Sequence, residues 1–175
     1  MEGLKMQNKL PLEVWLIGKG PSLQSHKWQE HEHPRICINE TVFVTPKPDA
    51  AIAIDYRVLD KYKEAKLQTL IYRKETHGQY VFTNMYLYSF KDITTSKHAT
   101  APIALGLLHN LGVRIVHFVG FDSMDGNSDY AQSIIDMKAQ GHNKDGYKQI
   151  NIVILETLTL LGMTAIWEHK TETAR

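Results

Sequence analysis

The stretch VWLIGKGPSL, Val14–Leu23, predicts the fold of this chain. The apolar run Val14–Ile17 is typical of a strand buried on both faces, as in a parallel sheet that helices cover. Gly18 and Gly20 allow a tight turn, and Pro21 suits the first turn of a helix, where its missing N–H has no intrahelical partner. Such a helix presents its positive dipole end to the carboxyl edge of the sheet, where a phosphate is stabilised.

This turn makes nucleotide binding the leading hypothesis. Lys19 and Ser22 add a charge and a hydroxyl group to it. The motif is not a Walker A loop, which requires GxxxxGK[ST]. It is also not the full GxGxxG fingerprint, because Leu23 stands in place of the third glycine. A structural turn between a core strand and a helix is the alternative interpretation.

Length and composition predict one domain that spans residues 1–175, with residues 1–10 as a flexible N-terminus. The 43% apolar and 22% charged residues are ordinary for a soluble globular protein, and a net charge of +1 gives no support for nucleic-acid binding. Cys37 is the single cysteine and lies in an apolar run, which favours a small buried residue over a nucleophile. We therefore expect a cytoplasmic protein. No apolar stretch approaches the ~20 residues that cross a bilayer.

The rest of the chain predicts a three-layer, Rossmann-like α/β domain with a mostly parallel twisted sheet. Further strands are expected at 35–38, 51–54, 70–72, 80–82, 114–119 and 164–167, with helices between several of them. The clearest helices are expected at 99–110 and 146–161, and Gly112 and Gly162 follow them as C-terminal stops. The breaker-rich segment 120–146, which includes a short helix at 130–138, is expected to be a mobile loop beside the ligand.

In a doubly wound sheet, ligands bind outside the carboxyl ends of the strands. The polar residues that follow the predicted strands should therefore converge on one crevice; they are Gly18–Ser22, Asn39, Glu40, Asp55, Tyr56, Gly120, Asp122 and Ser123. Asn39 lies 21 residues after Gly18, about where a dinucleotide-binding fold places its ribose contact. A turn residue that ends a strand is an equally good interpretation of Asn39.

No metal site is predicted. The three aspartates between residues 122 and 129 lack the EF-hand pattern, and the spacing of His26, His31 and His33 matches no zinc motif. A polar surface connection explains these histidines. His142 lies shortly before the long C-terminal helix, where it could act as a general base near neutral pH, and a solvated loop histidine is the alternative.

Three blocks of sequence carry a resemblance: 17–23 (IGKGPSL), 112–122 followed by Tyr130, and 141–144 (GHNK). Their order and spacing resemble the bacterial sialyltransferases of glycosyltransferase family forty-two and the related hydroxymethylpterin diphosphokinase-like domain, including short phage-encoded members. The resemblance covers most of the chain from Val14 to about Leu161.

The resemblance implies a CMP-sugar site. Gly18, Lys19, Gly20, Pro21 and Ser22 would hold the phosphate and ribose, and Asn39 would contact ribose or base. Asp122, the aspartate after the predicted strand 114–119, would also belong to the nucleotide-binding residues. A further donor contact falls on Thr100, or on Thr95 or Ser96 in another register. His142 would deprotonate the acceptor, and Tyr130 would stabilise the departing phosphate. Tyr130 matches the second of two tyrosines in the family, and the first falls on Met124, which lacks a hydroxyl.

The leading function is a glycosyltransferase-like, sialyltransferase-like protein that binds a nucleotide sugar and needs no metal cofactor. One alternative is a diphosphokinase-like enzyme that binds Mg²⁺ and ATP, in which Asp122, Asp125 or Asp55 helps to hold the ion. The other is a non-catalytic nucleotide-binding or interaction domain, for which Met124 and the few residues after the last strand are the basis. The acceptor and the oligomeric state stay open, and homo-oligomerisation is compatible with the sequence.

Overall fold

The structure, a computed structural model, describes residues 10–24, 27–53, 56–64, 70–73, 85–88, 99–121 and 144–168. Within these residues, seven strands form one sheet in the order β5-β4-β3-β2-β1-β6-β7, and every pair of neighbours is parallel. The strands are β1 Glu13–Ile17, β2 Arg35–Ile38, β3 Ala50–Ala53, β4 Leu70–Arg73, β5 Met85–Tyr88, β6 Ile115–Val119 and β7 Thr164–Trp167. The expected Rossmann-like α/β fold is confirmed.

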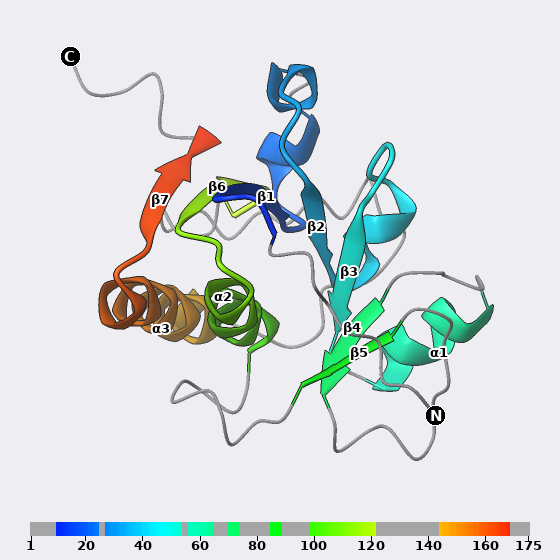
Figure 1. Cartoon of the computed structure of the whole chain (residues 1–175). Coiled ribbons are helices and arrows are strands. Elements are labelled where there is room, and N and C mark those ends of the chain that lie inside the picture. The colour runs from blue at the N-terminus through cyan, green and yellow to red at the C-terminus, as the bar shows by residue number, and fades with distance from the viewer. Residues whose placement is uncertain are drawn as a thin grey trace.

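Helices cover both faces of the sheet (Figure 1). The α-helices are α1 Tyr56–Glu64, α2 Thr100–Asn110 and α3 Lys144–Leu161, and the short 3₁₀ helices are η1 Pro21–Gln24, η2 Lys27–Glu30 and η3 Asn39–Phe43. Helices α2 and α3 lie side by side on one face, and α1 lies on the other. These three layers bury the two-sided apolar strands that the sequence predicts.

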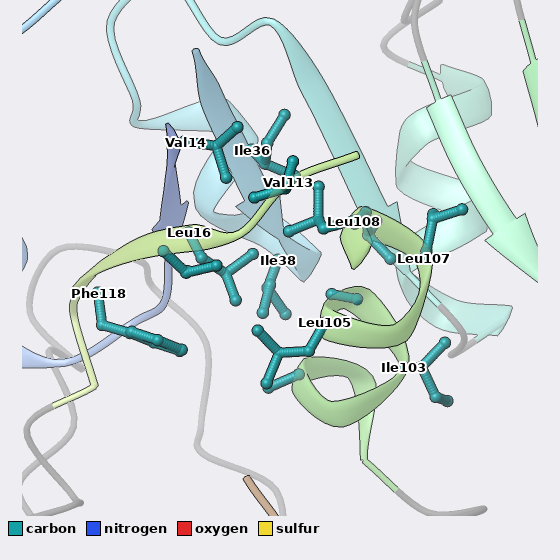
Figure 2. Packing of buried hydrophobic residues seen from close by; sticks show 14 of the residues in the cluster. Val14, Leu16, Ile36, Ile38, Ile103, Leu105, Leu107, Leu108, Val113 and Phe118 are labelled. Carbon is teal, nitrogen blue, oxygen red and sulfur yellow. The ribbon is translucent and has the colours of Figure 1, made fainter. Parts of the chain in front are cut away.

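The larger core lies between the sheet and the α2–α3 pair. It unites side chains from one face of the central strands with those of the two helices, namely Val14, Leu16, Ile36, Ile38, Ile103, Leu105, Leu107, Leu108, Val116, Phe118, Ile154 and Leu158 among others (Figure 2). The expected stripe of α3 is confirmed, since Ile154 and Leu158 are buried and Ile150 and Leu161 pack against this core.

Helix α2 is buried more completely than its sequence pattern predicts. Every residue from Ala101 to Leu108 is buried, whereas the pattern indicated one apolar face with Ile103, Leu107 and Leu108. The reason is that α2 contacts strands β2 and β3 as well as α3, so both sides of the helix face apolar neighbours.

A smaller core covers the opposite face of the sheet. It joins Trp15, Ile17, Cys37 and Val119 of the strands to Val58, Leu59 and Tyr62 of α1, together with Leu23, Trp28, Val42, Ala51 and Ala53. Trp15 and Trp28 meet edge to face with ring centroids 5.9 Å apart. Alternate residues of β1 therefore supply both cores, which explains its continuous apolar run.

The strand predictions agree with the structure to within a residue at several ends. The strands at 35–38 and 164–167 match their predicted bounds, and Gly112 and Gly162 adopt the positive φ angles of 100° and 60° expected at helix C-termini. Strand β5, at Met85–Tyr88, was not predicted, although its tyrosines favour strands. The predicted strand at 80–82 and the helix at 130–138 lie outside the described residues, as do residues 1–9.

No helix in the described part of the chain combines the length and apolarity needed to cross a bilayer.

We expect Leu105→Ala to lower the free energy of unfolding by about 2–5 kcal/mol, because it leaves a cavity in the larger core. Leu160→Ala is the matched control: it is the same change in a helix, at a side chain that is 72% exposed. It should alter the free energy by less than about 0.5 kcal/mol. Urea unfolding of both variants measures the difference, and equal effects would contradict the described core.

Candidate functional site

The strand order places a topological switch at β1. The chain continues from β1 to β2 on one side, whereas β6, about a hundred residues later, pairs with the other side. In doubly wound sheets the ligand lies outside the carboxyl ends of the strands at this point. The segments that follow β1, β2 and β6 therefore define the candidate site, and they include Gly18–Ser22, Asn39 and Gly120.

The ends of β1 and β6 approach so closely that both need glycine. A Cβ atom on Gly120 would lie 2.1 Å from the carbonyl oxygen of Gly18, and one on Gly18 would lie 2.5 Å from the carbonyl oxygen of Gly120. Gly120 also has a φ of 73°, which side-chain-bearing residues rarely adopt. The sequence alone explains Gly18 by the need for a tight turn. The structure adds a second reason, because the backbone of Gly120 lies too close to Gly18 for a side chain.

Hydrogen bonds join the turn after β1 to the end of β6. Gly18 N–H donates to the Val119 carbonyl at 2.8 Å, and Gly20 N–H donates to the Gly120 carbonyl at 2.6 Å. The Ser22 hydroxyl oxygen accepts from Gly120 N–H at 2.8 Å. These backbone groups hold the protein together and are not free donors for a phosphate.

A short helix follows the turn. Pro21 begins it, as the sequence predicts, and it is η1, a 3₁₀ helix of four residues in which Leu23 N–H donates to the Gly20 carbonyl at 3.0 Å. One 3₁₀ turn has little of the aligned dipole that an α-helix presents to an anion. The phosphate-binding role of this turn stays a prediction.

Lys19 pairs with a buried carboxylate. Its ammonium group forms an ion pair with Oε2 of Glu40, whose side chain is 3% exposed, and the Lys61 ammonium lies 3.9 Å from Oε1 of the same group. Two lysines thus lie beside this one carboxylate. A buried carboxylate needs such partners, because burial without them is costly.

Asn39 lies at the end of β2 in a left-handed conformation, with a φ of 56°. Its side-chain Oδ1 accepts a hydrogen bond from the Thr100 hydroxyl at 3.3 Å, and its backbone carbonyl accepts one from the Tyr62 hydroxyl. The structure thus brings together Asn39 and Thr100, two of the residues that the resemblance selects, from positions 61 residues apart. Thr95 and Ser96, the other candidates for this contact, lie outside the described residues.

Thr100 is also the first residue of α2, so the N-terminus of this helix reaches the same edge. Ala99 precedes it in an extended conformation and provides no side-chain cap, and no acidic residue lies in the first turn. Eleven aligned peptide units, Thr100–Asn110, therefore direct their positive end to the neighbourhood of Asn39. The positive helix end comes from α2 and not from the segment after β1.

Two buried side chains, Tyr62 and Thr41, form hydrogen bonds at and next to Asn39. The Thr41 hydroxyl lies within hydrogen-bond distance of the Ile38 carbonyl at 2.9 Å and the Ile17 carbonyl at 3.0 Å, so it links the ends of β1 and β2. Burial, followed by the proximity of the acidic groups Cys37 and Glu40, raises the pKa of Tyr62 well above its ordinary value. The Tyr62 hydroxyl stays protonated and remains a donor to Asn39.

The sequence reasoning did not identify Tyr62, Thr41 or the role of Glu40. Glu40 was recognised as a polar residue after a strand, and its neighbour in the crevice, Lys19, was expected to face a ligand. No local pattern reveals that these two side chains pair. Asp55, Asp122, Asp125, Tyr130 and His142 lie outside the described residues, and their roles stay predictions.

We expect Gly120→Ala to destabilise the protein more than Gly162→Ala. Both glycines have positive φ angles, 73° and 60°, so alanine costs about 1–2 kcal/mol of backbone strain at either position. A Cβ atom at Gly162 meets nothing within 4 Å, whereas one at Gly120 collides with the Gly18 carbonyl. Urea unfolding should show an additional cost of about 2 kcal/mol or more for Gly120→Ala. Equal losses would contradict the strand-end contact.

Cys37 is fully buried, as the sequence predicted, and burial raises its pKa to about 11 despite hydrogen bonds with Thr45 and Thr41. The thiolate is the reactive form, so we expect no labelling of the folded protein by a thiol reagent at pH 8 and rapid labelling in urea. Because the thiol ionises near 9.0 in the unfolded chain, its contribution to stability is complete below that pH. It is lost as the pH rises to about 11. Labelling at equal rates in both states would contradict this burial.

Comparison with known proteins gives no family for this chain: no protein-family model and no curated protein sequence matches it.

Proposed function

We propose that this chain binds a nucleotide sugar of the CMP-sugar type at the carboxyl edge of the sheet, between the end of β2 and the start of α2. The hydrogen bond from Thr100 to Asn39 carries this proposal, because it joins two polar side chains at the topological switch, where doubly wound sheets bind ligands. The resemblance to the sialyltransferases points to Asn39 and, in one of its two registers, to Thr100.

Asn39 suits the recognition of a ribose or a pyrimidine. Since its Oδ1 accepts from Thr100, the amide nitrogen is left as the donor end of the side chain. The left-handed backbone and the Tyr62 hydrogen bond hold the residue in one orientation. A group fixed in this way loses little conformational entropy when a ligand binds.

Electrostatics favour a phosphate at the same edge. The N-terminus of α2, which has no side-chain cap, provides partial positive charge next to Asn39. No magnesium ion is needed in this scheme, since the positive charge comes from the protein. Under the diphosphokinase-like alternative, binding would depend on Mg²⁺ and would prefer ATP.

The proposal extends to transfer of the sugar through His142 as the base and Tyr130 as a donor to the leaving phosphate, as the resemblance implies. A second candidate function is nucleotide binding without catalysis. It is favoured by Met124, which stands where the family has a tyrosine and cannot donate a hydrogen bond to the leaving phosphate. Sugar transfer from CMP-sialic acid to an acceptor, or hydrolysis of the donor, separates the two functions.

Asn39→Gly is the sharpest test of the site, because glycine keeps the left-handed backbone and removes the amide. Lys47→Gly is the matched control: Lys47 is the other described non-glycine residue with positive φ, at 49°, and it is exposed. We expect Asn39→Gly to weaken CMP binding roughly tenfold through the lost hydrogen bond, and Lys47→Gly to leave it unchanged.

Thermal unfolding measures both variants with CMP, CMP-sialic acid and ATP, each with and without Mg²⁺. At a ligand concentration of about a hundred times the Kd, binding adds ~2.7 kcal/mol of stability. For a domain of this size that is a shift of roughly 5–10 °C. A shift with ATP and Mg²⁺ alone would replace this proposal by the diphosphokinase-like one. No shift with any nucleotide would refute nucleotide binding.

A further inference from the structure

Two histidines and a glutamate meet at the opposite end of β1. Glu13 is the first residue of β1, His33 lies two residues before β2, and His117 is the middle residue of β6. In the register of the sheet Trp15 pairs with His117, and side chains two residues apart lie on one face of a strand. Glu13, Trp15 and His117 therefore share a face, although they are remote in sequence.

The ring nitrogens of both histidines approach the same carboxylate oxygen. Nε2 of His117 lies 3.2 Å from Oε2 of Glu13, and Nε2 of His33 lies 3.5 Å from that oxygen. One ligand atom from each residue can be chosen so that all three lie within 4.8 Å of one another. Nitrogen and oxygen ligands about 2.0–2.2 Å from a tetrahedral zinc ion lie about 3.3–3.6 Å apart, so a small adjustment would allow one ion to contact all three.

The surroundings hold the ligands in place. The ring of His117 lies against Trp15 at 4.9 Å and stacks on His33 at 4.9 Å. The His117 side chain is 13% exposed, and those of Glu13 and His33 are 36% and 35% exposed. The ring of Trp15 thus covers one side of the cluster, and the exposed parts of Glu13 and His33 leave the other side accessible to an ion.

We propose that Glu13, His33 and His117 bind a divalent transition-metal ion, with Zn²⁺ as the ion that suits two imidazoles and one carboxylate. Three protein ligands leave a fourth position for water or another group. Hydrogen bonds from the two imidazole rings to the Glu13 carboxylate are the competing explanation of the cluster, and a zinc titration separates the two explanations.

The position of this site indicates a structural role. β-strands rise about 3.3 Å per residue, which places Glu13 ~17 Å from Gly18 at the other end of β1. An ion there cannot reach a ligand at the carboxyl edge. It would link the start of β1, the segment before β2 and the middle of β6, three parts of the chain that meet only in the folded protein.

The experiment uses the untagged full chain, freed of metal by a chelator and then titrated with ZnCl₂ in a calorimeter and in thermal unfolding. We expect one equivalent of zinc to bind and to raise the unfolding temperature. Cobalt(II) in place of zinc provides a direct readout, because its visible absorption reports ligand number and geometry.

His33→Gln is the decisive variant, since His33 lies outside the strands and its side chain is one-third exposed. It should weaken zinc binding roughly tenfold or more and change the cobalt spectrum. His31→Gln is the matched control: His31 is exposed, stacks on His33 with centroids 6.5 Å apart, and is not one of the three ligands. It should bind zinc as the unchanged protein does.

Absence of saturable zinc binding in the unchanged chain would overturn the proposal, as would equal affinity in His33→Gln. The CMP response of the same variants separates this result from the proposed function. His33→Gln should keep its response to CMP, because the two sites lie at opposite ends of β1. Loss of zinc binding with an intact CMP response is therefore the expected pattern.

Discussion

The arrangement of the candidate site depends on the backbone contact between the ends of β1 and β6. Gly18 and Gly120 touch through main-chain atoms, and three hydrogen bonds connect the turn after β1 to the end of β6. Neither residue has a side chain, so main chain alone joins the two strands at the topological switch. The polar side chains of the candidate site, Asn39 and Thr100, lie instead at the end of β2 and the start of α2.

The sequence predicted the fold well because its signals were local. A mostly apolar run of four residues, such as RICI at 35–38, indicates a strand without information from distant residues. Glycines after α2 and α3 likewise mark the helix ends. The sequence was less informative where burial or strand formation depends on neighbouring elements. Helix α2 is buried on both sides because of its neighbours, and strand β5 has a sequence whose strand character depends on pairing with β4.

The candidate site was predictable in part. Asn39 could be selected because it follows a buried strand, and Thr100 because of the family resemblance. The pairing of Lys19 with Glu40 was not predictable, since it depends on how deeply η3 buries the glutamate. Local spacing also does not reveal that His33 and His117 lie together, because they are 84 residues apart and meet through the pairing of β2 and β6 with β1.

The central position of β1 also has a consequence for how this chain folds. Its partner on one side, β2, follows within about twenty residues, whereas its partner on the other, β6, is about a hundred residues away. During synthesis β1 would therefore spend most of the time with one apolar edge unpaired, a state prone to wrong pairing. Contacts of such long range also slow folding, since loop closure must precede them. Completion of the sheet thus waits for the last third of the chain.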